Sequence, residues 1–84
     1  MMRQGIMIFD LQGWKIWIGQ QDYETFEGMA FELRIQKHYF KAYLGKEDQE
    51  WYVILDEDVA FNLRVFEVYK VRIEYIDITS GNAS

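Results

Sequence analysis

The sequence contains no cysteine and no proline, a single histidine, and no long hydrophobic run. Without cysteine the chain has no disulfide, no thiolate zinc site and no cysteine nucleophile. Such a chain suits a reducing compartment, so we expect a cytoplasmic protein. No stretch approaches the ~18 apolar residues of a membrane span, and the apolar run near the N-terminus is too short for a signal peptide. We therefore expect no membrane partner.

Basic residues are also scarce. Nine Lys and Arg face fourteen Asp and Glu, which gives a net charge of −5. A protein that binds DNA or RNA directly needs a basic footprint, and this composition has the opposite sign. We therefore expect no direct nucleic-acid binding. An acidic protein is attracted instead to proteins with basic clefts.

Apolar and aromatic residues are abundant. Half of the 84 residues are hydrophobic, and they include six Phe, six Tyr and three Trp. A chain this short buries only about 60–65% of its unfolded surface, so its core has to be dense. The length fits one domain. We expect a single small β domain over residues 1–78 and a flexible polar tail over residues 79–84.

Alternation with a period of two dominates the chain. In the clearest segment Phe31, Leu33 and Ile35 share one face, and Glu32 and Arg34 share the other. The pattern predicts a hairpin from runs 6–9 and 14–18, and further strands over 30–35, 39–44, 51–55 and 69–76.

Two segments leave alternatives open. Residues 22–29 fit either a short helical turn or a loop that packs Phe26 inward, and we favour a loop or single turn because so few residues cannot hold a helix alone. Residues 58–66 place Val59, Leu63 and Phe66 at helical spacing. The end of that segment is nevertheless β-branched and looks extended.

These elements predict an all-β fold, with or without one short helix. Five or six short strands about ten residues apart favour a small SH3-like barrel or a curled antiparallel meander. Closure would also remove an edge problem, because a flat sheet ending in YKVRIEYI presents a strand prone to aggregation.

Several short aromatic signatures carry a resemblance. Gly28 precedes the alternating strand 30–35, an aromatic strand returns, and Trp51-Tyr52-Val53-Ile54 and Tyr69-Lys70-Val71-Arg72-Ile73 follow. Over residues 13–76 the chain resembles a family of small uncharacterised all-β, SH3-like domains of Gram-positive bacteria and their phages and mobile elements. That family has no assigned activity. The resemblance therefore implies a mobile-element or accessory context more than a mechanism.

Carboxylates flank the apolar run WYVIL. Three precede it and three follow it: Glu47, Asp48 and Glu50, then Asp56, Glu57 and Asp58. A five-residue strand separates the two groups by roughly 20 Å, so they cannot form the facing pair that glycoside hydrolysis needs.

Other catalytic or metal sites are not indicated. The acids after WYVIL lack the spacing of a calcium loop. His38 reads as an exposed turn residue without an orienting partner. We expect no catalytic residue, no metal and no cofactor, and hence no enzyme.

The same acids have two remaining interpretations. They either keep an aggregation-prone strand soluble or form a functional acidic surface. Aromatic parity adds to the second interpretation, because Trp14 and Trp17 point to opposite faces of a strand, as do Trp51 and Tyr52. One member of each pair is expected at the surface, and we select Trp17 and Tyr52 as candidate partner anchors.

We therefore hypothesise a non-catalytic protein–protein interaction module that binds a protein with a basic surface. Its more specific form is a phage or mobile-element inhibitor that mimics nucleic-acid charge and blocks the basic cleft of a defence nuclease, of the anti-CRISPR or anti-restriction type. The alternative is a self-associating structural domain in which strand 69–76 pairs with its symmetry mate. Monomer and homodimer both remain open.

Overall fold

The computed structural model describes residues 2–74, so the predicted tail at 79–84 and the last two residues of the predicted strand 69–76 lie outside it. The described chain is all-β, as predicted, and forms one antiparallel sheet of eight strands. No helix in this part is long and apolar enough to cross a bilayer. The strands are β1 (Met2–Asp10), β2 (Gly13–Ile18), β3 (Gln21–Glu24), β4 (Ala30–Ile35), β5 (His38–Glu47), β6 (Glu50–Leu55), β7 (Val59–Asn62) and β8 (Tyr69–Glu74).

The strands predicted from alternation are confirmed. β4 has the predicted bounds, and β1 and β2 form the predicted hairpin, with Phe9 opposite Trp14 and Asp10 opposite Gly13. The predicted number of five or six strands is wrong, because β3 and β7 add two strands of four residues each. Each is too short to show a reliable alternation. Pairing with β2 and with β6 holds them extended.

The segment 22–29 is β3 followed by a loop, and the inward packing of Phe26 is wrong. Phe26 is 62% exposed, whereas Met29 of the same loop is buried. The loop is held instead by its backbone: the Gly28 N–H donates to the Leu44 carbonyl at 2.7 Å, and the Thr25 N–H donates to the Trp14 carbonyl at 3.3 Å. The loop thus bridges β2 and β5.

The segment 58–66 is not an α-helix. A single 3₁₀ turn, η1 (Asp56–Asp58), leads into β7, and an irregular connection over 63–68 follows. Leu63 of this connection is buried and donates its N–H to the Trp51 carbonyl at 2.9 Å. The helical spacing of Val59, Leu63 and Phe66 is therefore coincidental, because only Leu63 is buried.

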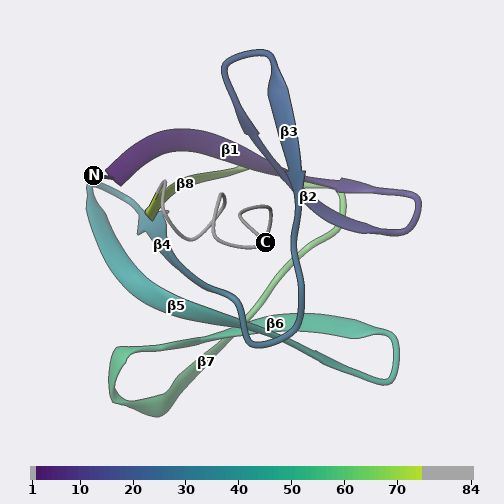
Figure 1. Ribbon diagram of the computed structural model, residues 1–84. Coiled ribbons are helices and arrows are strands. Elements are labelled where there is room, and N and C mark those ends of the chain that lie inside the picture. The colour runs from purple at the N-terminus through teal and green to yellow at the C-terminus, as the bar shows by residue number, and fades with distance from the viewer. Residues whose placement is uncertain (1, 75–84) are drawn as a thin grey trace, which may run out of the picture.

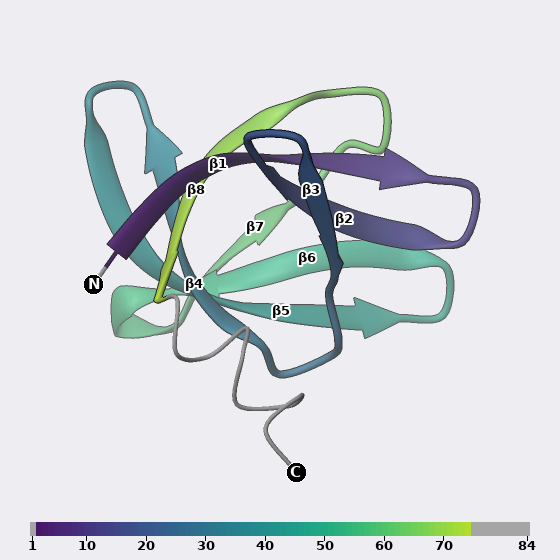
Figure 2. The same ribbon diagram turned by 45° about the horizontal axis from the view of Figure 1, so that its top comes forward.

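The sheet is curled but not closed, and its strand order is not that of a simple meander. The order is β3-β2-β1-β8-β4-β5-β6-β7, so β3 and β7 are the edges (Figures 1 and 2). The expectation that strand 69–76 forms an edge is wrong for its described part. Val71 of β8 lies opposite Gly5 of β1 on one side and Leu33 of β4 on the other. At Val71 and Arg72 both sides of the strand are paired, so self-association there has no free edge to use.

The concave side of the curled sheet holds the core. Trp14 lies at its centre, edge-to-face with Phe9 and with Tyr69 at ring separations of 5.3 and 5.6 Å. The Tyr69 hydroxyl accepts a hydrogen bond from the Arg64 N–H. Strands β1, β2, β4, β5, β6 and β8 contribute the other fully buried side chains, which are Met7, Ile16, Leu33, Ala42, Val53, Val71 and Ile73.

Candidate functional site

Two hairpin turns project from the same end of the molecule, and we call this region the hairpin end. It comprises the β1–β2 turn, residues 10–13, and the β5–β6 turn, residues 47–50 (Figures 1 and 2). Phe9 and Trp51 join them, with ring centroids 6.4 Å apart. The curl of the sheet therefore brings together two turns that lie nearly forty residues apart in the sequence.

The β5–β6 turn carries three of the predicted acids. Glu47 lies opposite Glu50 at the last paired position, and Asp48 occupies the turn with a positive φ of 56°. All three side chains are exposed. Like charges directly opposite each other in an antiparallel pair destabilise it. Within residues 2–74 none of the three forms an ion pair, and the adjacent Lys46 lies over the Trp51 ring instead.

The other predicted acids lie elsewhere. Asp56 and Asp58 belong to η1 at the opposite end of β6, about 20 Å away at ~3.3 Å per residue. Both are exposed, and Asp58 has a φ of 63°. The side chain of Glu57 lies outside what the structure describes. The six acids therefore do not form one surface, and only the group before WYVIL belongs to the hairpin end.

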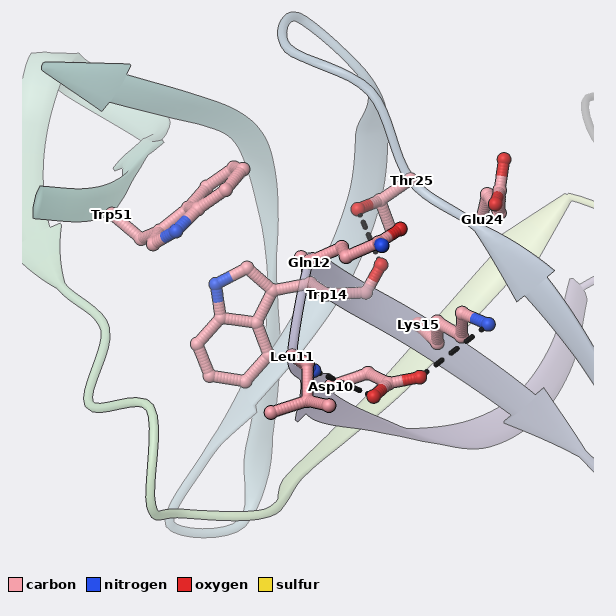
Figure 3. Close-up of a pocket in the computed structure, with 9 residues that line it drawn as sticks. Asp10, Leu11, Gln12, Trp14, Lys15, Glu24, Thr25 and Trp51 are labelled. Carbon is pink, nitrogen blue, oxygen red and sulfur yellow. Dashed lines mark hydrogen bonds and ion pairs between the residues drawn. The ribbon is translucent and has the colours of Figure 1, made fainter. Parts of the chain in front are cut away.

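A pocket of about 430 Å³ opens between the β1–β2 turn and Trp51 of β6 (Figure 3). Its walls combine aromatic, apolar and charged side chains: Asp10, Leu11, Gln12, Trp14, Lys15, Glu24, Thr25 and Trp51. Leu11 is 96% exposed at the rim. Trp51 adjoins Glu50 in the chain, but successive side chains of β6 point to opposite faces, so the acidic turn and the aromatic pocket share the hairpin end without sharing a cavity.

The Trp14 indole N–H is buried in the wall of this pocket without an acceptor in the described chain. Figure 3 shows the nitrogen on the side of the ring that faces Trp51. A buried donor without a partner costs about 1–3 kcal/mol of stability. Most buried donors in proteins are satisfied, so this one marks the pocket as an unusual part of the core.

Two lysines show how cations are held near this end. The Lys15 ammonium lies 3.5 Å from carboxylate oxygens of both Asp10 and Asp22. The hydrogen bond with Asp22 and its charge, assisted by Asp10, raise the pKa of Lys15 above 10.5. The Lys46 ammonium lies 5.1 Å from the centre of the Trp51 ring, so that ring already accepts a cation on one face.

The predicted aromatic anchors lie outside the pocket. Trp17 is 36% exposed while Trp14 is 1% exposed, which confirms that they point to opposite faces. Tyr52 is half-buried and lies across Gly45, its cross-strand partner, so closely that a methyl group at Gly45 would collide with its ring. Tyr52 thus covers a glycine in the sheet.

Sequence reasoning did not select Trp51 or Leu11. Trp51 and Tyr52 have opposite parity, but parity alone does not say which one borders a pocket. The exposed Glu50 immediately before Trp51 was the sequence feature that could have pointed to this position. His38 is exposed at the start of β5, as expected. In residues 2–74 no three His, Asp or Glu side chains cluster as metal ligands would.

The chain matches no protein-family model, no curated protein and no solved structure. The resemblance to the Gram-positive and phage domain family therefore stays a prediction.

Proposed function

We propose that this protein is a non-catalytic interaction module that binds the basic surface of a protein partner through its hairpin end. The carrying observation is the pair Glu47 and Glu50, which lie opposite each other at the exposed hairpin end and form no ion pair within residues 2–74. A cation from a partner would relieve their repulsion, so their arrangement favours an external basic group.

The pocket supports the same proposal. Aromatic side chains in a partly enclosed pocket are enriched among the residues that dominate binding energy. Trp51 attracts cations through its ring, and Glu24 adds a carboxylate to the walls, whereas Asp10 is already paired with Lys15. A partner Lys or Arg side chain therefore meets both an aromatic surface and a carboxylate here, whereas Leu11 provides an exposed apolar contact at the rim.

The more specific form is an inhibitor that imitates nucleic-acid charge. The net charge of −5 and the acids of the hairpin end support it, because a basic channel that binds nucleic acid also attracts such a surface. In this form the protein competes with DNA for a defence nuclease. If a saturating amount of it leaves DNA binding by the nuclease unchanged, the inhibitor form is wrong while the interaction module stands.

Charge reversal tests the site. We expect Glu47→Lys/Glu50→Lys to lose a partner captured from the native host, and wild-type retention to fall steeply as salt rises. The matched control is Asp56→Lys/Asp58→Lys, which makes the same change in net charge at the other end of β6. Retention by the control and loss by the first variant support the hairpin end. Equal loss from both variants means that only net charge matters and contradicts the proposal.

A further inference from the structure

The convex face of the sheet carries a basic hollow that is unexpected in so acidic a chain. The hollow has a volume of about 430 Å³ and is lined by residues of β1, β8, β4 and β5 and the β4–β5 turn: Gln4, Gly5, Ile6, Arg34, Lys37, Tyr39 and Lys70. Three of these side chains are cationic and none is a carboxylate. A smaller neighbouring hollow of about 310 Å³ shares Arg34 and Lys70.

Sheet register forces two of these cations together. Glu32 lies opposite Arg72 and Leu33 opposite Val71 in the β4–β8 pairing. The paired residues end there, and Arg34 and Lys70, the next residue on each strand, line both hollows. Like charges that share a hollow repel each other. In residues 2–74 neither cation forms an ion pair with a carboxylate.

The cation next to the hollow, Arg72, is paired with a carboxylate, unlike Arg34 and Lys70 in the hollow itself. Arg72 forms an ion pair with Glu32 and stacks on Tyr39, with its guanidinium carbon 3.9 Å from the ring centre. Tyr39 is thereby fixed as a wall of the hollow. Arg34 is oriented as well, because its Nε donates to the Gln36 carbonyl at 3.0 Å. That bond uses one of its five N–H groups.

We infer that this hollow binds the phosphate group of a small phosphate monoester. Lys and Arg are the side chains that bind phosphate, and a phosphate monoester carries nearly two negative charges at neutral pH. Three cations around one hollow match a single dianion. A nucleic-acid backbone instead carries one charge per nucleotide and needs cations along a track. The net charge of −5 further disfavours a long polyanion, and the volume lies in the range of small-molecule sites.

The inference goes beyond the proposed function and uses a different surface, so each can fail alone. The test is a titration monitored by backbone amide NMR, with inorganic phosphate, adenosine monophosphate, adenosine and a short oligothymidylate as separate probes. We expect inorganic phosphate and adenosine monophosphate to shift the amides of Arg34, Lys37 and Lys70. Adenosine, which lacks the phosphate, should leave them in place.

Variants locate the binding. Arg34→Gln/Lys70→Gln should weaken adenosine monophosphate binding about tenfold or more, since each lost charged hydrogen bond contributes to affinity. The control Lys41→Gln/Lys46→Gln removes the same charge outside the hollow and should change affinity about twofold at most. Circular dichroism of each variant verifies folding.

Three results would overturn the inference. The first is no amide shift with either phosphate probe at millimolar concentration. The second is equal weakening by the hollow variant and its control. The third is an oligothymidylate that binds at least about tenfold more tightly than adenosine monophosphate, which would assign the hollow to single-stranded nucleic acid.

Discussion

At the scale of single residues, the fold clearly alters the ionisation of Lys15. Its ammonium lies between Asp10 at the end of β1 and Asp22 on β3, and therefore ties three adjacent strands. The two carboxylates raise the pKa of Lys15 above its ordinary value of 10.5. The folded state thus favours the charged form. Its contribution to stability is fully present below pH 10.5 and disappears as the pH rises through the higher folded pKa.

We therefore predict a pH-dependent effect of Lys15→Met. The free energy of unfolding should be lower in the variant than in the wild type at neutral pH, because Asp10 and Asp22 lose their shared cation. The difference should shrink above pH 10.5, where the wild-type lysine also loses its charge. Urea denaturation across the alkaline range measures it, with Lys37→Met as the control without an ion pair. A difference that stays constant through that range would contradict the role of charge.

At the scale of elements, the β5–β6 hairpin shows how one strand depends on the shape of its neighbour. Tyr52 packs across Gly45, so the glycine is required for close approach rather than for an unusual backbone angle. We predict that Gly45→Ala lowers the free energy of unfolding by about 1–3 kcal/mol, because the new methyl group displaces the ring.

Gly13→Ala is the matched control for this element. A methyl group at Gly13 meets no atom within 4 Å, and its φ is not positive. Urea denaturation of Gly13→Ala should therefore show no loss, or a gain of up to about 1 kcal/mol from reduced freedom of the unfolded chain. Equal destabilisation by the two substitutions would mean that glycine is needed at Gly45 for another reason.

At the scale of the whole molecule, the position of β8 makes the domain a single unit. β8 joins the β1–β3 wing to the β4–β7 wing, and its Val71 packs in the shared core beside Leu33. A substitution that destabilises one wing should therefore also destabilise the other, and the domain should unfold cooperatively.

We predict that Leu33→Ala lowers the free energy of unfolding by about 2–5 kcal/mol, as expected for a fully buried leucine. Circular dichroism and tryptophan fluorescence should report the same midpoint. Leu11→Ala is the control, since Leu11 is 96% exposed, and it should change stability by about 0.5 kcal/mol at most. Separate midpoints for the two probes would show that the wings unfold independently.

Charge is also organised at this scale. The net charge of −5 agrees in sign with the acidic hairpin end. It does not reveal the basic hollow formed by Arg34, Lys37 and Lys70. These three residues are separated in the sequence by carboxylates and apolar residues. Only the pairing of β4 with β8 brings Arg34 and Lys70 to one place, so a count of charges could not reveal the hollow.

Only part of the candidate site could be predicted from the sequence, because some of its residues are neighbours in the chain and others meet only in the folded protein. The acids Glu47, Asp48 and Glu50 are local in sequence, and a turn between two strands is bound to expose them. Trp51 was not selected because its pocket depends on the distant turn that follows β1. The two short strands β3 and β7 were missed because four residues carry little periodicity, and their conformation follows from neighbouring strands.

By itself, the sequence determined that this protein is an all-β domain and which side chains share a face of each clear strand, because alternation along a strand is a local property of the backbone. Only the tertiary structure decided that β8 lies at the centre of the sheet, that the β1–β2 turn and Trp51 border one pocket and that cations converge on the convex face. Those features follow from register between distant strands, where a shift of one residue turns every side chain to the other face.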